Sequence, residues 1–458
     1  MNLNRRMFLQ GGATAGLLRG QSRKPNIVMF LADDHGYFDS PVYGNRSVGT
    51  PNMQRLASDG MTFTNMFSPS PTCVPSRSIV STGLLPARNG AERNHSGVGP
   101  DIRTLPTFMK SAGYHIAHFG KSHFQPKESF PDWEWVRSEI QGGRLNADLD
   151  TRALRSWIEA RTNNTQPLCL FVCSHSPHVY WRGNEGYDAA KVDLPPTFVD
   201  TPETREARTQ YYSDVTFADR QLGDAYDLVK QHLGGNTLFI YTSDNGAQWP
   251  FAKWSLYDAG IRLPFIASWP GVIRPGSRTG AMASFCDLLP TFLDCAGAAA
   301  PSGIDGRSFA KVLRGTARTH RTAITATHSG DGDWNVYPMR CLRTTRFKYI
   351  LNLHPEFEYH THIDLADPAD GRSYFDSWVA KARTDAKAAA VVRRYHERPA
   401  EELYDITADP HEMKNLAADT KYAGMLREMR ERLRAIMNEQ GDQGRVYGKP
   451  RLISKAPQ

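Results

Sequence analysis

The sequence lacks the features of a membrane-spanning or nucleic-acid-binding protein. No stretch of the 458 residues approaches the roughly 18 consecutive apolar residues that a membrane span requires. After Lys24 no run of basic residues is longer than a pair, whereas a protein that binds nucleic acid concentrates lysine and arginine on one face. The formal net charge of +7 depends mainly on the segment 1–24, which holds five basic residues and no acidic one. We therefore expect neither a membrane span nor a nucleic-acid partner.

Cysteine is also scarce. The chain has six cysteines, and no two of them have the spacing of a zinc knuckle. Cys169 and Cys173 lie inside an apolar run that predicts a strand. We expect the cysteines to be mainly small core residues, with Cys73 as the one in a distinctive local sequence.

The segment 1–24 predicts an export signal. Asn4-Arg5-Arg6-Met7-Phe8-Leu9 is similar to the twin-arginine signal, and a weakly apolar run of small residues follows at 11–18. The run is short, and Arg19 ends it without a clear cleavage triplet, so a disordered start is the alternative. We expect an exported protein, periplasmic or secreted.

Up to position 330, continuous apolar runs alternate with longer amphipathic segments. Apolar runs without alternation are typical of parallel strands that are covered on both faces, and here they predict strands at 26–32, 115–119, 168–173, 237–242 and 264–269. The segments between them predict helices at 52–58, 104–112, 150–160 and 204–232. This order predicts an α/β domain over residues 25–330.

The chain changes character after position 330. Residues 337–342 and 346–353 predict a hairpin about Arg343-Thr344-Thr345, and 402–406 predicts a further short strand. Residues 422–438 have helical apolar spacing. We expect a smaller C-terminal domain at 331–458, built from an antiparallel sheet and a packed helix.

Polar residues follow four of the predicted strands. Because ligand crevices of open parallel sheets lie at the carboxyl ends of the strands, these residues should form one site although they are far apart in sequence. Three carboxylates and an amide oxygen in this set offer only hard oxygen ligands, which favours Ca²⁺ or Mg²⁺ over Zn²⁺, and we predict calcium. The groups are Asp33-Asp34, Lys121-Ser122-His123, His175-Ser176-Pro177-His178 and Asp244-Asn245.

The pentapeptide Cys73-Val74-Pro75-Ser76-Arg77 carries the most specific signal. A cysteine three residues before a Ser-Arg pair, with proline between, resembles the signal at which maturation enzymes oxidise cysteine to Cα-formylglycine. On its own the motif also fits a buried cysteine beside a proline turn that opens a helix. On this motif, with Gly120-Lys121-Ser122-His123, Pro177-His178 and Lys253, the chain resembles the type I, formylglycine-dependent sulfatases.

The resemblance implies a fold, a metal and a mechanism. It implies an alkaline-phosphatase-like architecture with a large mixed, mostly parallel sheet flanked by helices and a smaller antiparallel C-terminal sheet. It implies one Ca²⁺ and a partner enzyme, either formylglycine-generating or anaerobic sulfatase-maturating, that converts Cys73. The implied metal ligands are Asp33, Asp34, residue 73 as formylglycine, Asp244 and Asn245, and the implied catalytic residues are Cys73, Arg77, Lys121, His123, His178 and Lys253.

The same resemblance assigns a role to each catalytic residue. Hydrated formylglycine at position 73 attacks the sulfur, while Arg77, Lys121 and Lys253 neutralise charge on the sulfuryl oxygens. His178 protonates the leaving group, and His123 removes the proton from the second hydroxyl so that sulfate is expelled. His175 either fixes a tautomer or contacts substrate.

Within the family, Tyr337-Pro338-Met339-Arg340, 346–353 and 403–416 look most like the heparan N-sulfatases. This likeness implies a sulfated carbohydrate substrate, with N-sulfoglucosamine at the non-reducing end as first candidate. Two features depart from it, namely a shorter segment between His178 and Pro195 and Ala87-Arg88 where those enzymes have a histidine. The alternatives are an O-sulfatase for another sulfated polysaccharide such as an algal one, a phosphate or phosphonate ester hydrolase, and a non-catalytic glycan-binding protein.

Overall fold

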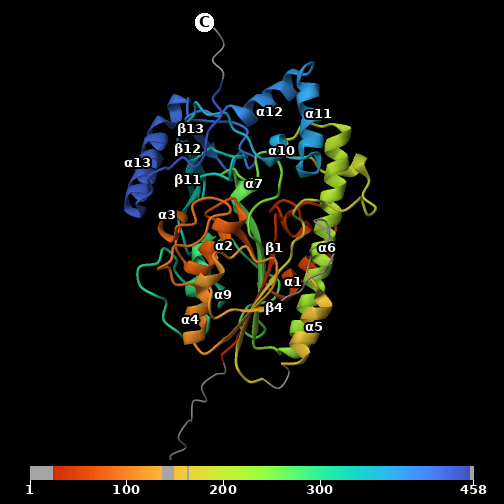
Figure 1. Ribbon diagram of the computed structural model, residues 1–458, viewed down its shortest axis with the longest axis vertical. Helices are drawn as coiled ribbons and strands as arrows, with labels where there is room; N and C mark the ends of the chain where they lie inside the picture. Colours follow the sequence, from red (N-terminus) through yellow and green to blue (C-terminus); the bar gives the residue numbers. More distant parts are fainter. Residues whose placement is uncertain (1–23, 137–148, 162–163, 454–458) are drawn as a thin grey trace, which may run out of the picture.

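A computed structural model of the chain describes residues 24–136, 149–161 and 164–453. Two β-sheets organise it, and Figure 1 shows the C-terminal elements gathered at one end of its long axis. The predicted twin-arginine segment lies outside the described residues, apart from Lys24. Within those residues no helix is both long and apolar enough to cross a membrane.

The large sheet has the strand order β4-β3-β5-β1-β6-β7-β2-β8, with β9 paired to β2. Five neighbouring strands, from β4 to β6, are all parallel, which confirms the predicted α/β class. The central strands β1, β5 and β6 are almost wholly buried, as their continuous apolar sequences require. The strands are β1 (Asn26–Ala32), β2 (Met61–Phe67), β3 (His115–Gly120), β4 (Glu134–Val136), β5 (Leu168–Cys173), β6 (Thr237–Ser243), β7 (Arg262–Ser268), β8 (Ser277–Thr279) and β9 (Ala283–Ser284).

The prediction that 264–269 forms a parallel strand was wrong in direction. The strand exists as β7, but it runs antiparallel to both β6 and β2. Apolar periodicity reports burial on both faces and carries no information about direction. After β6 the chain turns back at the same edge of the sheet, where Gly246 N donates to Gly260 O at 2.9 Å. Because no crossover within the described residues carries the chain to the opposite edge before β7, this strand runs antiparallel to β6. A Cβ at Gly246 would lie 1.9 Å from Ala259 O, so only glycine fits this close approach.

Helices cover both faces of the large sheet. On one face Val28 and Phe30 of β1 pack with residues of α1, α5 and α6, whereas Ile27 and Met29 pack with α2, α4 and α8 on the other. Figure 1 shows α1, α5 and α6 on one side of β1 and α2, α4 and α9 on the other. These helices and their short neighbours are α1 (Pro51–Asp59), α2 (Cys73–Thr82), α3 (Pro86–Asn89), α4 (Leu105–Ser111), α5 (Thr151–Glu159), α6 (Pro202–His232), α7 (Asp258–Ile261), α8 (Leu288–Cys295) and α9 (Ala310–Leu313).

The small sheet is antiparallel and has the order β10-β11-β12-β13. The predicted hairpin is its central pair, and the sheet takes its first strand from residues before the expected boundary at 331. α13 packs against β11 and β12, and α11 packs against α6. The elements are β10 (Ala323–His328), β11 (Met339–Thr344), β12 (Phe347–Asn352), α10 (His362–Leu365), α11 (Arg372–Ala382), α12 (Ala386–His396), β13 (Glu401–Asp405) and α13 (Ala423–Gln440).

A buried ionic cluster joins the small sheet to the large one. Lys348 of β12 lies 2.5 Å from Asp258 Oδ1 of α7 and 2.8 Å from Glu412 Oε1, and none of the three is exposed by more than 1%. Arg343 of β11 reaches Asp258 Oδ2 at 3.0 Å. Burial and the neighbouring carboxylate Asp258 raise the pKa of Glu412 to about 7, although Lys348 opposes this. The lysine therefore holds two buried carboxylates together.

Replacing Lys348 with methionine is expected to destabilise the protein by about 3–5 kcal/mol, because removing one member of a buried ion pair leaves an uncompensated buried charge. The midpoint of urea unfolding measures this change. Lys381→Met is the matched control, since the Lys381 side chain is 40% exposed and its ion pair with Asp385 is long, at 3.9 Å. Its effect should stay below about 0.5 kcal/mol, and equal losses in the two variants would contradict the role given to the cluster.

Candidate active site

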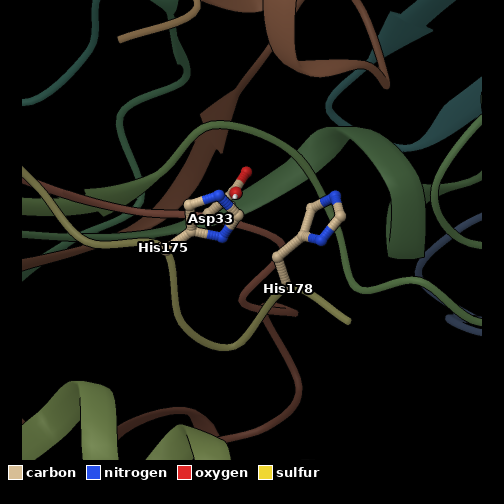
Figure 2. A group of neighbouring side chains, drawn as sticks. All are labelled: Asp33, His175 and His178. Carbon is tan, nitrogen blue, oxygen red and sulfur yellow. Dashed lines mark ion pairs between the residues drawn. The ribbon is translucent and has the colours of Figure 1, made fainter. Parts of the chain in front are cut away.

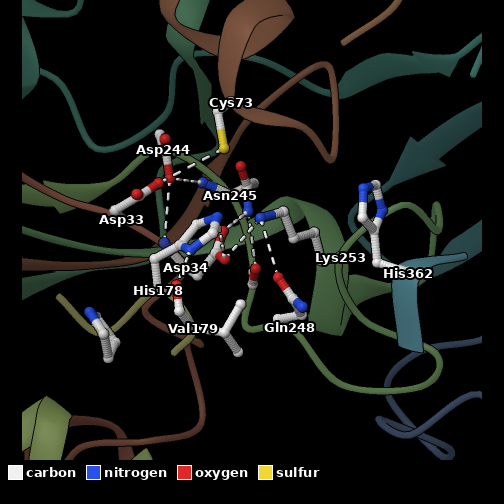
Figure 3. Close-up of polar contacts among 12 residues, drawn as sticks. Asp33, Asp34, Cys73, His178, Val179, Asp244, Asn245, Gln248, Lys253 and His362 are labelled. Carbon is white, nitrogen blue, oxygen red and sulfur yellow. Dashed lines mark hydrogen bonds and ion pairs between the residues drawn. The ribbon is translucent and has the colours of Figure 1, made fainter. Parts of the chain in front are cut away.

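The predicted polar residues meet at the carboxyl edge of the large sheet (Figure 3). Asp33 and Asp34 follow β1, and Asp244 and Asn245 follow the adjacent parallel strand β6. The N-terminus of α2 brings Cys73 to the same place. One side-chain atom each of Asp33, Asp34, Cys73 and Asp244 lies within 4.8 Å of the others, and all four residues are buried. The residues that the sequence placed in one crevice therefore do lie together.

Three basic side chains balance the three buried carboxylates. Lys121 forms an ion pair with Asp33. Lys253 lies 2.6 Å from Asp34 Oδ2. Arg77 Nε donates to Asp244 Oδ2 at 2.9 Å, and Arg77 Nη2 lies 2.9 Å from the same oxygen. Buried charges are tolerated when each has a partner of opposite sign at such distances. Arg77, Lys121 and Lys253 therefore neutralise the negative charge of the acidic cluster.

The pKa values of the three carboxyl groups diverge because they share one buried site. Burial and the neighbouring Asp33 carboxylate raise the pKa of Asp244 to about 7. Burial also raises the pKa of Asp34, and Asp33 adds to this shift. Burial opposes ionisation of Asp33 as well, but Lys121 and the other nearby cations hold its pKa well below the ordinary value. An additional positive charge at the site would therefore stabilise the ionised forms of Asp244 and Asp34.

The chemistry of these donors fits a hard metal ion. Asn245 Nδ2 donates to Asp34 Oδ1 at 2.6 Å, whereas Asn245 Oδ1 is buried and accepts no hydrogen bond within the described residues. A buried acceptor without a donor is costly unless a cation satisfies it. Three carboxylates and this amide oxygen form the oxygen-rich set that calcium prefers.

Cys73 is the first residue of α2, and Arg77 follows one turn later on the same face. The thiol donates to Asp33 Oδ1 at 3.5 Å, and burial raises its pKa well above that of free cysteine. An unmodified cysteine at this position is therefore protonated and a poor nucleophile. Arg77 also donates to the Lys121 carbonyl oxygen at 3.2 Å, so the guanidinium is fixed between two loops of the site.

The predicted histidines border the acidic cluster. His178 Nδ1 donates to the Val179 carbonyl oxygen at 2.5 Å, and Nε2 lies 3.8 Å from Asp34 Oδ2. Burial and then Lys253 lower the pKa of His178 well below its usual value. His175 lies on the same loop with Nδ1 3.9 Å from Asp33 Oδ2, and Figure 2 shows its ring beside that of His178.

His123 completes the predicted set. Its Nδ1 is buried and has no hydrogen-bond partner within the described residues. Burial, reinforced by Lys121 and Arg77, lowers its pKa to about 2. The imidazole is therefore neutral at physiological pH and can accept a proton.

A second polar group beside Lys253 was not predicted as part of the site. Asp331 accepts hydrogen bonds from Asn94 Nδ2 at 2.9 Å and from Trp254 Nε1 at 2.6 Å. His362 stacks on the Trp254 ring with a centroid separation of 5.0 Å, and Lys253 Nζ lies 5.0 Å from the same ring. No local signal in the sequence pointed to this group, because isolated polar residues in loops leave no periodic pattern.

Comparison with known proteins extends these observations. The family model described as sulfatase matches residues 25–298, and the one described as N-sulphoglucosamine sulphohydrolase, C-terminal, matches 246–383. The chain is 34% identical over 428 residues to an ulvan-active sulfatase of Formosa agariphila, covering 92% of this chain and 81% of that protein. It is 28% identical over 465 residues to human N-sulphoglucosamine sulphohydrolase, covering 91% and 90%.

The architecture is shared with solved structures. A protein in complex with its substrate D-glucosamine-2-N,6-O-disulfate matches with a TM-score of 0.69 and 21% identity, over 92% of this chain and 99% of that one. The likeness confirms the predicted alkaline-phosphatase-like fold, with its large mixed sheet and small antiparallel C-terminal sheet.

Proposed function

We propose that this chain, which belongs to the sulfatase family and hydrolyses sulfate esters or sulfamates, uses formylglycine at position 73 and one calcium ion to remove sulfate from glycans. The observation that carries the proposal is the burial of Cys73 against Asp33, inside a set of three carboxylates and three basic side chains. Export of the protein and conversion of Cys73 by a maturation enzyme are parts of the same proposal.

Asp33, Asp34, Asp244, Asn245 and residue 73 would hold the calcium ion, which supplies positive charge at the nucleophile. Hydrated formylglycine supplies a hydroxyl nucleophile that cysteine cannot provide. The positive charge of calcium would also reduce the repulsion between the ionised forms of the buried carboxylates.

Three basic side chains would bind the sulfate group. Arg77, Lys121 and Lys253 already lie in the crevice, each fixed by a carboxylate, so they need little reorganisation when a sulfate enters. Their charge would bind the sulfuryl oxygens and stabilise charge that develops on them.

The two histidines would move the protons. The hydrogen bond from Nδ1 of His178 to the Val179 carbonyl leaves Nε2 facing the cluster, so the protonated ring can give its Nε2 proton to the departing nitrogen or oxygen and become neutral. The negative charge of bound sulfate would offset Lys253 and so raise the pKa of His178 towards the range of a general acid. His123, which is neutral, would accept a proton from residue 73.

N-sulfoglucosamine at the non-reducing end is the first candidate substrate. The C-terminal family match at 246–383 supports it, because that segment includes Lys253 and His362 beside the cluster. An O-sulfated polysaccharide is the second candidate, supported by the 34% identity to an ulvan-active sulfatase. Sulfate release by the matured enzyme from N-sulfoglucosamine, O-sulfated glucosamines, ulvan oligosaccharides and an aryl phosphonate ester distinguishes these functions. Release from O-sulfated sugars without release from the sulfamate would overturn the first candidate.

His178→Ala is expected to act selectively. An amine leaving group needs a proton, so kcat/KM for the sulfamate should fall by about 10²–10⁴-fold. An aryl sulfate departs without an acid, so its loss should be about tenfold or less. Steady-state kinetics on both substrates measure the ratio, and His232→Ala is the control, because His232 lies at the end of α6. Equal losses on the two substrates would contradict the role of His178 as the acid.

A further inference from the structure

A second group of potential metal ligands lies in the C-terminal part of the chain. Glu358 and His360 precede α10, and His396 is the last residue of α12. One carboxylate oxygen and one nitrogen from each ring lie within 4.8 Å of one another. His360 Nε2 is 3.1 Å from Glu358 Oε2, and the two histidine rings are 5.0 Å apart. The group takes no part in the catalytic chemistry described above.

Each of the two histidine rings is held by a hydrogen bond from its Nδ1 atom. His360 Nδ1 donates to Asp364 Oδ2 at 2.5 Å, and His396 Nδ1 donates to the Tyr359 carbonyl oxygen at 3.0 Å. Because a carbonyl and a carboxylate only accept, Nδ1 carries the proton in each ring, and a neutral ring keeps its lone pair on Nε2. Metal-binding histidines are fixed in this way by an outer carboxylate or carbonyl group.

The inner nitrogen of His360 faces the Glu358 carboxylate. His360 Nε2 is buried and forms no hydrogen bond of good geometry within the described residues, although a Glu358 oxygen is close. A nitrogen lone pair and a carboxylate oxygen at this distance repel each other unless a proton or a cation lies between them. Either a proton or a metal ion between His360 and Glu358 would satisfy both groups.

We propose that Glu358, His360 and His396 bind a divalent transition-metal ion of the zinc class. Two imidazoles and one carboxylate are ligands for zinc and its neighbours, whereas calcium and magnesium prefer an all-oxygen set such as the one at the active site. Glu358 is 36% exposed, so the ion would be reached from solvent and water would fill its fourth position. The active-site ion and this ion would thus differ in chemistry.

The ion would add to contacts that already join these segments, such as the hydrogen bond from Tyr359 N to the His396 carbonyl oxygen at 2.8 Å and the edge-to-face packing of Tyr359 against Tyr395. It would tie the end of α12 to the segment before α10, where Glu358 N also donates to the Arg451 carbonyl oxygen at 2.9 Å. His362, two residues after the ligand His360, stacks on Trp254 beside Lys253. The site is therefore structural and supports the wall next to the active site.

The test uses full-length, calcium-loaded protein, so that calcium fills the oxygen-rich site. After equilibration with Zn²⁺ and dialysis into calcium buffer, wild-type protein should retain about one zinc per chain by elemental analysis. Co²⁺ in place of zinc should give visible absorption bands. His396→Ala and Glu358→Gln should lose the retained zinc and the cobalt bands, and zinc should raise the Tm of wild type but not of His396→Ala.

His115→Ala is the matched control, since His115 forms an ordinary pair with Glu134 at 2.6 Å, and it should bind zinc as wild type does. Glu358→Gln removes a half-exposed charge only, so it stays informative if His396→Ala fails to fold. Three outcomes would overturn the proposal: no zinc retained by wild type, zinc retained equally by both variants, or zinc lost on His178→Ala instead. The last outcome would place the zinc at the active site.

Discussion

Replacing Cys73 with alanine is expected to lower kcat/KM for the sulfated substrate by a factor on the order of 10⁵ or more, as removal of a catalytic nucleophile does in other hydrolases. The change removes the residue that the proposed maturation converts, so neither the nucleophile nor its metal-binding oxygen can form. The protein should remain folded, because among the described residues the Cys73 thiol makes a single hydrogen bond, at 3.5 Å to Asp33. Initial rates on the preferred substrate and circular dichroism measure the two effects.

The control for this prediction is Cys169→Ala. Cys169 is fully buried in β5, and burial raises its pKa as it does that of Cys73. The substitution should cost about 1 kcal/mol of stability or somewhat more and leave activity nearly unchanged. If both variants were equally inactive, burial of a thiol and not its conversion would explain the loss of activity.

Mass spectrometry tests the modification itself. In active protein made beside a maturation enzyme, the peptide that contains residue 73 should show oxygen in place of sulfur and two fewer hydrogens. Protein made without such an enzyme should keep cysteine, bind calcium and turn over poorly. Full activity with an unmodified cysteine would refute the proposed mechanism.

The acidic cluster could be predicted from the sequence because of where its members stand. Asp33-Asp34 and Asp244-Asn245 follow strands whose apolar runs are unmistakable, and parallel strands deliver their following residues to one edge. Cys73 and Arg77 could be assigned because their motif is local and specific. These inferences needed the order of elements along the chain but not the details of packing.

Other features could not be predicted, for physical reasons. The direction of β7 depends on how the chain turns after β6, which apolar periodicity does not encode. The contacts of Asp331 with Asn94 and Trp254 join loops that are far apart along the chain, and each residue alone is unremarkable in sequence. The group of Glu358, His360 and His396 depends similarly on the docking of α12 beside the segment before α10.

Removal of calcium should abolish most activity and lower stability together. Because the proposed ligands at 33, 34, 244 and 245 come together only when the chain is folded, calcium at about 1,000 times its Kd should stabilise the protein by about 4 kcal/mol. Loss of its charge at the nucleophile should reduce kcat/KM by a factor on the order of 10³, since a metal ion contributes several kcal/mol to catalysis. Chelator titrations followed by activity and by Tm should therefore give the same apparent Kd, and added calcium should restore both.

The calcium affinity should also depend on pH in a direction that the buried carboxyl groups determine. Burial and the Asp33 carboxylate raise the pKa of Asp244 to about 7, so this carboxyl group is partly protonated at neutral pH in the metal-free site, and the pKa of Asp34 is raised in the same direction. Calcium binds the ionised forms and must release those protons, so its affinity should fall as pH falls below about 7, and calorimetry in buffers of different ionisation enthalpy should detect the release. Asp244→Asn should weaken binding by a factor on the order of 10² or more, whereas Asp227→Asn, which changes a carboxylate that is 61% exposed and paired with Arg55, should leave it unchanged. A calcium affinity that does not change between pH 5 and pH 8 would contradict this prediction and would show that Asp244 is ionised throughout, its neighbouring cations Arg77 and Lys121 outweighing its burial.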